Sequence, residues 1–265
     1  LARADIFAKP LFRAILTFLK KLPVYRQRDG QRNLDKNNQI FDLSRDVLLD
    51  GYPLCLMAEG RHNDRHHLLN MGKGMFRIAG ETQLKLGDHP LYIVPTGIDF
   101  DEYERPYANL VVTIEKPIPV QQYMDTYRDN EPVALNEMRK DLATALSPLM
   151  HDIRHEEYYD EILTLSQVQN KEMRRKEGLK NDAWNRFRMR QLISQRLDAK
   201  AAAPDEEFSR EMEKARNYIN VCKELRMRPV DVAEHWGLAA TTLSALFIAG
   251  IVVAAVMMAP VRWVL

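Results

Sequence analysis

The sequence predicts an α/β domain with a mostly parallel sheet flanked by helices, followed by an all-helical region and a C-terminal transmembrane helix. Short apolar runs alternate with helix-period segments over the first 120 residues, glycine almost disappears between residues 131 and 227, and residues 238–261 carry no charge. Strands that alternate with helices pair in parallel through right-handed crossovers. We therefore expect three regions: residues 1–120 as the α/β domain, 121–237 as the helical region and 238–261 as the membrane span.

The first elements are two helices around a short strand. In residues 10–21 the apolar side chains recur at helical spacing, and Pro10 suits the first turn of a helix. Residues 22–25 then form a short strand candidate. A second helix is expected over about residues 34–49, with Gly51 as its stop signal.

Three apolar runs provide the expected buried strands of the sheet. Residues 53–57 are apolar throughout, as in strands covered on both faces, and Cys55 in this run is expected in the core. A helix over about residues 73–80 separates this run from the strands at residues 91–94 and 110–114. The order strand, helix, strand supports the parallel arrangement.

Composition excludes several classes of protein. The chain has 265 residues with 38 basic and 37 acidic side chains, a formal net charge of +1. It therefore lacks the basic excess that is typical of nucleic-acid binders. Its two cysteines, Cys55 and Cys222, cannot build a disulfide framework or a zinc site. A reducing compartment fits this usage best.

The helical region contains one strongly basic stretch. Residues 171–200 hold ten Lys or Arg against four Asp or Glu. This stretch is either a solvated helical face or a surface that meets anionic lipid headgroups, where each basic residue contributes roughly 1 kcal/mol. A break between helices is expected at residues 203–205, where Ala-Pro-Asp interrupts the pattern.

The uncharged segment 238–261 is long enough to cross a bilayer. A helix of its 24 residues is roughly 36 Å long, against a hydrocarbon core of about 30 Å. Lys223, Arg226 and Arg228 precede the segment, whereas only Arg262 follows it. This bias places the preceding domain on the cytoplasmic side. A buried core helix is the alternative.

Polar residues follow the predicted strands at their carboxyl ends, where ligands bind in open α/β sheets. Arg26 and Arg28 leave the first short strand together, and two guanidinium groups can converge on one phosphate, although solvated arginines are the simpler interpretation of this pair alone. Pro95, after the strand at residues 91–94, can shape a pocket wall.

The third polar group follows the strand at residues 53–57. Glu59 and Gly60 are joined there by Arg61 and His62. A carboxylate, a glycine that permits close backbone approach and neighbouring cationic donors together suit a polyol phosphate.

In this order the three stretches resemble motifs II, III and IV of the glycerol-3-phosphate and 1-acylglycerol-3-phosphate (lysophosphatidic acid) acyltransferase superfamily. Residues 69–79, Leu-Asn-Met-Gly-Lys-Gly-Met-Phe-Arg-Ile-Ala, are similar to the Lys-Gly helix start that follows motif III. The resemblance covers about residues 1–120. It implies the acyltransferase fold, with acyl-CoA or acyl carrier protein as donor, a glycerophospholipid precursor as acceptor and membrane lipid as a partner. No metal or redox cofactor is required.

The resemblance also implies roles for individual residues. Arg26 and Arg28 would face the phosphate of the acceptor. Glu59 and Gly60 would help to bind its glycerol part, with Glu59 as the candidate catalytic residue. The implied substrate-binding residues are Arg26, Arg28, Glu59, Gly60, Arg61, His62 and Pro95.

Two positions depart from the family pattern Pro-Glu-Gly-Thr-Arg. Ala58 replaces the proline, and Arg61-His62 stands in place of Thr-Arg. The cationic role falls either to Arg61, one position early, or to His62, which is only partly charged near neutral pH.

Motif I of the superfamily, His-x4-Asp, supplies a histidine that acts as general base on the acceptor hydroxyl. Residues 1–25 contain no histidine, and the chain begins at Leu1. We therefore expect motif I upstream of Leu1, and we expect the 265-residue chain to be inactive or nearly so. His155 and Asp160 match the spacing, but they follow motif IV within a charged helical stretch.

Two alternatives remain open on the sequence alone. An acceptor without a phosphate, such as an ornithine lipid or a glycolipid, would leave the arginines with less to bind. A non-catalytic, membrane-tethered lipid-binding protein would lack motif I altogether. For an enzyme, we expect localisation at a membrane with the catalytic domain on the cytoplasmic side.

Overall fold

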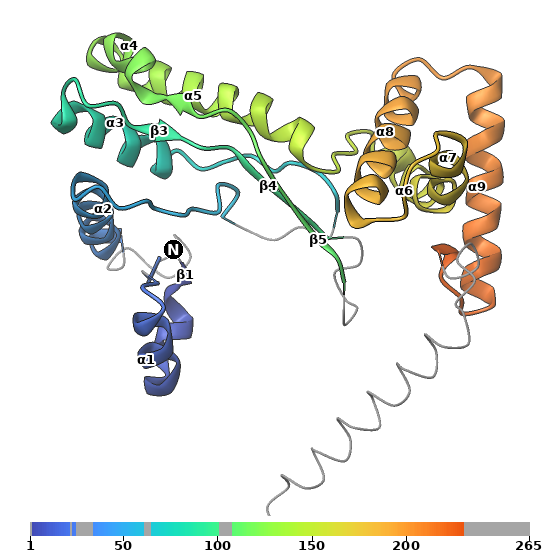
Figure 1. Ribbon diagram of the computed structural model, residues 1–265, viewed down its shortest axis with the longest axis horizontal. Coiled ribbons are helices and arrows are strands. Elements are labelled where there is room, and N and C mark those ends of the chain that lie inside the picture. Colours follow the sequence, from blue (N-terminus) through green and yellow to red (C-terminus); the bar gives the residue numbers. More distant parts are fainter. Residues whose placement is uncertain (1, 22, 25–33, 61–64, 101–107, 231–265) are drawn as a thin grey trace, which may run out of the picture. The chain divides into compact units, whose positions relative to one another are not determined.

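The computed structural model describes residues 2–21, 23–24, 34–60, 65–100 and 108–230 (Figure 1). The chain divides into two compact units, residues 1–152 and 153–265. Each unit is described by itself below. The domain boundaries predicted at residues 120 and 237 concern independent folding and remain a prediction.

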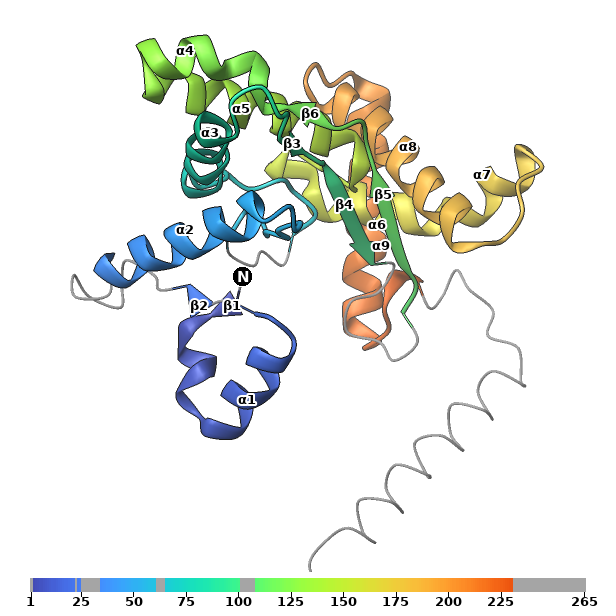
Figure 2. The same ribbon diagram turned by 60° about the vertical axis from the view of Figure 1, so that its left-hand side comes forward.

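The N-terminal elements form a small group of their own. Strand β1 (Ala2–Arg3) pairs in parallel with β2 (Pro23–Val24), and the 3-10 helix η1 (Ala4–Ala8) and helix α1 (Pro10–Phe18) lie between them in sequence. Figure 2 shows α1 next to this strand pair. Helix α1 buries none of its residues, although it has the predicted apolar spacing. Its exposed apolar side chains are Leu11, Phe12, Ile15 and Phe18.

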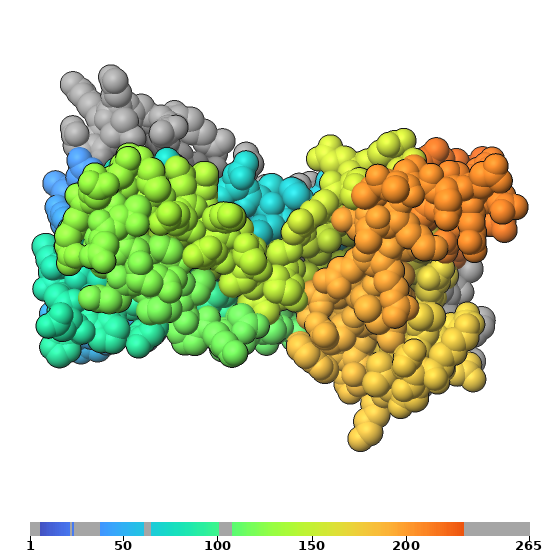
Figure 3. Space-filling model, turned by 90° about the horizontal axis from the view of Figure 1, so that it is seen from above, coloured from blue at the N-terminus to red at the C-terminus, as the bar shows by residue number. Residues whose placement is uncertain are grey.

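The core of the first unit lies among three helices, α3 (Gly74–Leu86), α4 (Met124–Asp129) and α5 (Glu131–Leu146). A further helix, α2 (Leu34–Leu49), packs against α3. Phe76 of α3 is fully buried against residues of α4 and α5. In the space-filling view of Figure 3, the green surface of α4 and α5 lies against the teal surface of α3. The 3-10 helices η4 (Val120–Tyr123) and η5 (Ser147–Leu149) complete this unit.

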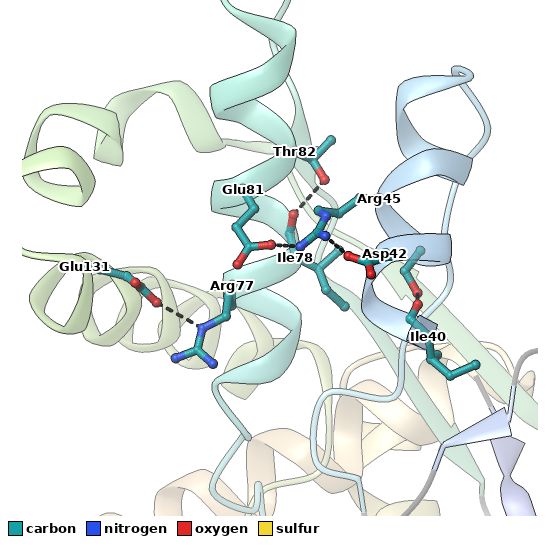
Figure 4. A network of polar contacts seen from close by, with 9 residues as sticks. Ile40, Asp42, Arg45, Arg77, Ile78, Glu81, Thr82 and Glu131 are labelled. Carbon is teal, nitrogen blue, oxygen red and sulfur yellow. Dashed lines mark hydrogen bonds and ion pairs between the residues drawn. The ribbon is translucent and has the colours of Figure 1, made fainter. Parts of the chain in front are cut away.

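Helix α3 is tied to both of its neighbours by ion pairs (Figure 4). Arg45 of α2 contacts Glu81 of α3 and also Asp42 of its own helix. On the other side of α3, Arg77 donates from Nε to Glu131 at the start of α5 over 3.0 Å. These ion pairs join α3 to α2 and α5 outside the apolar core.

Four strands in the first unit form two antiparallel pairs. Strand β3 (Tyr92–Ile93) pairs with β6 (Ile118–Pro119), and β4 (Thr96–Phe100) pairs with β5 (Leu110–Ile114). The register of the longer pair runs from Thr96 opposite Ile114 to Phe100 opposite Leu110. Along β4 the burial alternates, with Gly97 and Asp99 buried and the residues beside them exposed.

The predicted mostly parallel sheet is wrong. Nine residues separate β4 from β5, fewer than the dozen or so that a parallel crossover needs, so these strands pair antiparallel. The apolar run 53–57 forms no strand, and Cys55, expected in the core, is exposed. Within the residues that the structure describes, the one parallel pair is β1 with β2, of two residues each. Helices dominate the fold.

The second unit is a group of helices. It comprises the 3-10 helix η6 (Glu156–Tyr158), α6 (Tyr159–Val168), α7 (Asn170–Lys176), α8 (Ala183–Ala201) and α9 (Glu206–Glu224). Its core includes Ile162, Ile193, Phe208 and Met212. Helix α8 ends and α9 begins around the predicted break, where the Asp205 side chain accepts from the backbone N–H of Phe208 as an N-cap.

The predicted transmembrane helix has no counterpart among the helices seen here. Across residues 2–230, apart from the gaps given above, no helix is both long enough and apolar enough to cross a membrane. The segment expected to do so, residues 238–261, lies outside the part of the chain that the structure describes. Helices α2 to α9 each bury residues within their own unit, whereas α1 buries none.

Candidate active site

The structure places three of the seven candidate residues. Glu59, Gly60 and Pro95 lie in described segments of the first unit. The other four, Arg26, Arg28, Arg61 and His62, lie outside the described residues. The site can therefore be built from the segments that flank these four residues.

Glu59 fixes the loop that it begins. Its carboxylate Oε1 accepts a hydrogen bond from the backbone N–H of Leu69 over 2.6 Å. This bond joins the two ends of the segment 60–68, which contains Arg61 and His62. A carboxylate can accept about four hydrogen bonds, so the bond to Leu69 is compatible with a ligand contact at the same side chain.

Gly60 makes the turn that starts this loop. Its φ is +63°, in the left-handed region that favours glycine, and its N–H donates to the carbonyl of Met57 over 3.1 Å. A Cβ added to Gly60 would meet no atom within 4 Å. Glycine is therefore needed here for the backbone conformation, and the space beside it is open to solvent or to a ligand.

The far end of the loop is held by Asp152, 84 residues further along the chain. Asp152 Oδ1 accepts from the backbone N–H of Leu68 over 3.1 Å, and Oδ2 accepts from the Ser147 hydroxyl over 3.0 Å. The ring Nδ1 of His67 lies 3.3 Å from Oδ1, although it is not aligned for a hydrogen bond. The Asp152 side chain is 6% exposed. Two carboxylates, Glu59 and Asp152, thus anchor one loop.

Strand β4 is joined to the same region. The carboxylate of Asp99 accepts from the backbone N–H of His151 over 3.2 Å, and both residues are buried. The ring centroids of His151 and His66 lie 4.7 Å apart. A Cβ at Gly97 would lie 2.4 Å from the carbonyl oxygen of Leu149. The residues from Ser147 to Asp152 therefore contact both β4 and the loop that Glu59 begins.

Pro95 is buried at the start of β4, as a wall residue would be. Its carbonyl accepts from the backbone N–H of Glu115 over 3.0 Å and extends the pairing of β4 with β5. Helix α3, which starts just after the Glu59 loop, approaches α2 closely, since a Cβ at Gly74 would lie 3.2 Å from the Phe41 ring. No hydrogen bond is seen between Pro95 and Glu59, both of which the structure describes. The segment from Ser147 to Asp152 contacts the strand that follows Pro95 and the loop that follows Glu59.

The comparison with protein families identifies this part of the molecule. A family model described as Acyltransferase matches residues 1–99. This segment belongs to the acyltransferase family. The resemblance drawn from the motifs is confirmed over these residues, and all seven candidate residues lie within them. No curated protein and no solved structure matches the chain.

The acyltransferase segment does not contain every residue that shapes its loop. The segment from Ser147 to Asp152 lies beyond residue 99, yet it supplies the second anchor. Sequence analysis missed Asp152 because no local pattern marks it, and its partners are distant in sequence. The nearest available signal was the pair His151-Asp152, a few residues after the helix that ends at Leu146.

His155 and Asp160, which match His-x4-Asp in spacing, do not form a pair. His155 Nδ1 lies 3.0 Å from Asp198 Oδ1 of α8, and Asp160 is exposed. The same Asp198 oxygen accepts from the backbone N–H groups of Arg154 and His155 over 3.1 and 2.9 Å. Asp198 therefore holds the chain before α6 against α8, and His155 has a structural role in the second unit.

Proposed function

We propose that the protein is a lipid acyltransferase of glycerophospholipid synthesis. The donor would be acyl-CoA or acyl carrier protein, and the acceptor would be glycerol-3-phosphate or 1-acylglycerol-3-phosphate. The observation that carries the proposal is the turn at Glu59 and Gly60, which lies in the acyltransferase segment and begins a loop anchored at both ends. We place this activity at the cytoplasmic face of a membrane, where such lipids are found.

The proposed reaction transfers an acyl group from the thioester sulfur of the donor to a hydroxyl oxygen of the acceptor. The acceptor hydroxyl oxygen attacks the thioester carbonyl, a C–O bond forms and the C–S bond breaks, so that the thiol leaves. The hydroxyl proton is taken up by a general base, which returns it to the departing sulfur. Glu59 supports this reaction in two ways: its carboxylate positions the loop through Leu69, and its remaining acceptor capacity suits the hydroxyls of the glycerol part.

The phosphate of the acceptor would be bound by the cationic side chains of the same segment. Arg26 and Arg28 are the proposed ligands, joined by Arg61 or His62 from the loop that Glu59 and Leu69 close. A guanidinium group binds a phosphate with two parallel charge-assisted hydrogen bonds. Anchoring of the segment at both ends limits the conformational entropy that would be lost on binding a ligand.

Two substitutions at Glu59 separate its structural role from its role toward substrate. Glu59→Gln keeps an oxygen that can accept from the Leu69 N–H but removes the charge, whereas Glu59→Ala removes both. In the full protein encoded by the gene, we expect Glu59→Gln to lower kcat/KM about tenfold or more with an unchanged melting temperature. Glu59→Ala should lower kcat/KM and also the melting temperature. Equal kcat/KM in wild type and Glu59→Gln would show that acyl transfer does not need the negative charge, and that the side chain acts only through its hydrogen bond to Leu69.

The acceptor class is tested with Arg26→Ala and matched acceptors. We expect this variant to raise the KM for 1-acylglycerol-3-phosphate by the equivalent of roughly 1.5–3 kcal/mol. The KM for 1-acylglycerol, which lacks the phosphate, should not change. An unchanged KM for both acceptors would favour a non-phosphorylated lipid. Absence of acyl transfer to any acceptor, with lipid binding retained, would favour the non-catalytic lipid-binding protein.

A further inference from the structure

One face of helix α8 in the second unit is exposed along the length of the helix. Its large side chains are Trp184, Arg188, Leu192, Arg196 and Lys200, spaced four residues apart, and all are exposed. We call these five residues the α8 face. Side chains at this spacing lie along one side of a helix. The α7 and α8 surfaces lie next to each other in Figure 3, in yellow and light orange.

The opposite side of α8 forms the core of the unit. Met189, Ile193 and Leu197 are buried there in one core with residues of α6 and α9. The one acidic residue of α8, Asp198, also lies off the exposed face, because it pairs with His155 before α6. The α8 face therefore carries three positive charges and no negative charge of its own helix.

The apolar members of the α8 face remain open to solvent. Trp184 is 48% exposed and Leu192 is 38% exposed. The guanidinium carbon of Arg188 lies 5.8 Å from the centre of the Trp184 ring, and its Nη1 donates to Gln191. The Arg196 and Lys200 side chains have no polar partner among the residues that the structure describes. Two cations are thus available next to two exposed apolar groups.

We propose that the α8 face binds an anionic lipid surface. Indole rings favour the headgroup level of a bilayer, where one end is apolar and the other wet. Arginine and lysine can lay their apolar stems along the acyl boundary while the charged groups reach lipid phosphates. The face spans residues 184–200 and needs no deep insertion. The choice of lipid as the partner rests on the proposed function, since the substrates would reside in a bilayer.

The pattern of the face favours a lipid over a macromolecular partner. The core of a protein interface is depleted in charge and contiguous in apolar area, whereas here Arg188 separates the two apolar residues. Nucleic-acid binders usually show a strong basic excess, but the chain has a net charge of only +1. A bilayer surface accepts alternating charged and apolar groups because its own groups are mobile.

The test compares binding of the full protein to two kinds of vesicle by flotation. One contains phosphatidylcholine alone, and the other contains phosphatidylcholine with phosphatidylglycerol at about three to one. The quantity measured is the ratio of the partition coefficients for anionic and neutral vesicles. We expect this ratio to exceed about tenfold for the wild type at low salt and to fall as salt is added, because exposed charges are screened.

The double variant Arg196→Glu with Lys200→Glu should lower that ratio to about one or below. The matched control, Arg210→Glu with Lys214→Glu on α9, makes the same charge change and should retain most of the preference. Trp184→Ser should weaken binding to anionic vesicles about tenfold. Arg196→Gln with Lys200→Gln, at exposed positions, repeats the test should the reversal variant unfold. Equal ratios for the wild type and the α8 variants would overturn the proposal.

Two further outcomes are distinguishable. Suppose the protein binds both kinds of vesicle equally, while it binds an acyl carrier protein in a manner that depends on Arg196 and Lys200. The α8 face then binds an acidic protein, and the lipid proposal is wrong. Acyl transfer is measured separately on soluble short-chain substrates. Vesicle binding without any acyl transfer would refute the proposed function alone, and acyl transfer without a vesicle preference would refute only the α8 face.

Discussion

Asp152 holds in place a loop that lies far from it in the sequence, the loop that follows Glu59. Its two oxygens accept from the Leu68 backbone and from the Ser147 hydroxyl, and its side chain is buried. Removal of a partner from a buried hydrogen bond costs about 1–3 kcal/mol, because the remaining donor is left without water. Asp152 should therefore matter for stability and for substrate binding, although it lies outside the acyltransferase segment.

We expect Asp152→Ala to lower the free energy of unfolding by about 2–4 kcal/mol, since both donors lose their acceptor. The KM for the acceptor should rise as well, because one end of the Glu59 loop is released. Urea denaturation followed by circular dichroism measures the first effect and steady-state kinetics the second. Asp160→Ala, at an exposed aspartate, is the control. A normal KM in Asp152→Ala would show that Glu59 alone positions the loop.

Gln83 has a comparable role at the junction of α3 and β3. Its amide nitrogen donates to the carbonyls of Gly87 and His89, and its oxygen accepts from the N–H of Leu91 over 2.7 Å. We expect Gln83→Leu to lower the free energy of unfolding by about 1–3 kcal/mol, because Gln83 is buried and three part-buried backbone groups lose their partner. Gln121→Leu, at an exposed glutamine, is the control, and thermal unfolding is the measurement. Comparable melting temperatures for the two variants would contradict this role.

At the scale of elements, helix α3 is the part of the first unit on which the others pack. It approaches α4 so closely that a Cβ at Gly80 would lie 2.4 Å from Cε2 of Tyr127. The Tyr127 hydroxyl is ionised with difficulty, because burial raises its pKa. The ring is therefore a neutral packing group under physiological conditions, and glycine at residue 80 makes room for it.

This close approach predicts a change of sign in a double-mutant cycle. Gly80→Ala alone should lower the melting temperature, because the steric cost exceeds the roughly 1 kcal/mol that alanine gains over glycine within a helix. In a Tyr127→Ala background the ring is absent, so Gly80→Ala should raise the melting temperature. Destabilisation of equal size in both backgrounds would mean that the constraint at residue 80 comes from elsewhere.

Helices were predictable from the sequence where their signals are local. The helix expected at residues 34–49 is α2, and the predicted break at 203–205 lies between α8 and α9. The helix expected at 73–80 begins correctly but continues to Leu86, because Gly80 is accommodated inside it. Apolar periodicity and helix caps depend on residues a few positions apart, so they can be recognised without the tertiary structure.

Strand pairing was not predictable in the same way. The expected parallel sheet requires knowledge of which apolar runs meet, and the run at residues 53–57 forms no strand pair. Two clues pointed against the prediction: the short connection between β4 and β5, and the alternation of Gly97 and Asp99 with apolar residues along β4. The motif residues could be predicted because their sequence resembles that of a known family. The role of Asp152 could be identified only from the structure.

At the scale of the whole molecule, the two units have separate hydrophobic cores. Residues such as Phe76 and Leu135 form one core, and Ile162 and Phe208 belong to the other. A core of its own is the physical requirement for independent folding. The family segment lies entirely within the first unit.

We expect residues 153–230 to fold as a separate fragment with cooperative thermal unfolding. Phe208 is fully buried in this unit, and Phe208→Ala should cost about 3–5 kcal/mol and abolish the transition in so small a fragment. Circular dichroism measures both. Asn217→Ala, at an exposed position of α9, should leave the transition intact. A fragment without a cooperative transition would show that the second unit depends on the first.

The anchor at Asp152 has a consequence for how related chains change with time. Asp152 and the pair His67-Leu68 are in contact although 84 residues separate Leu68 from Asp152. A replacement of the carboxylate leaves the backbone N–H of Leu68 without an acceptor. Such a replacement should persist only when the loop conformation also changes in the same lineage. Substitutions at residues 67 and 152 should therefore be correlated among homologous sequences, and an ancestor that acquired one would have been under selection to acquire the other.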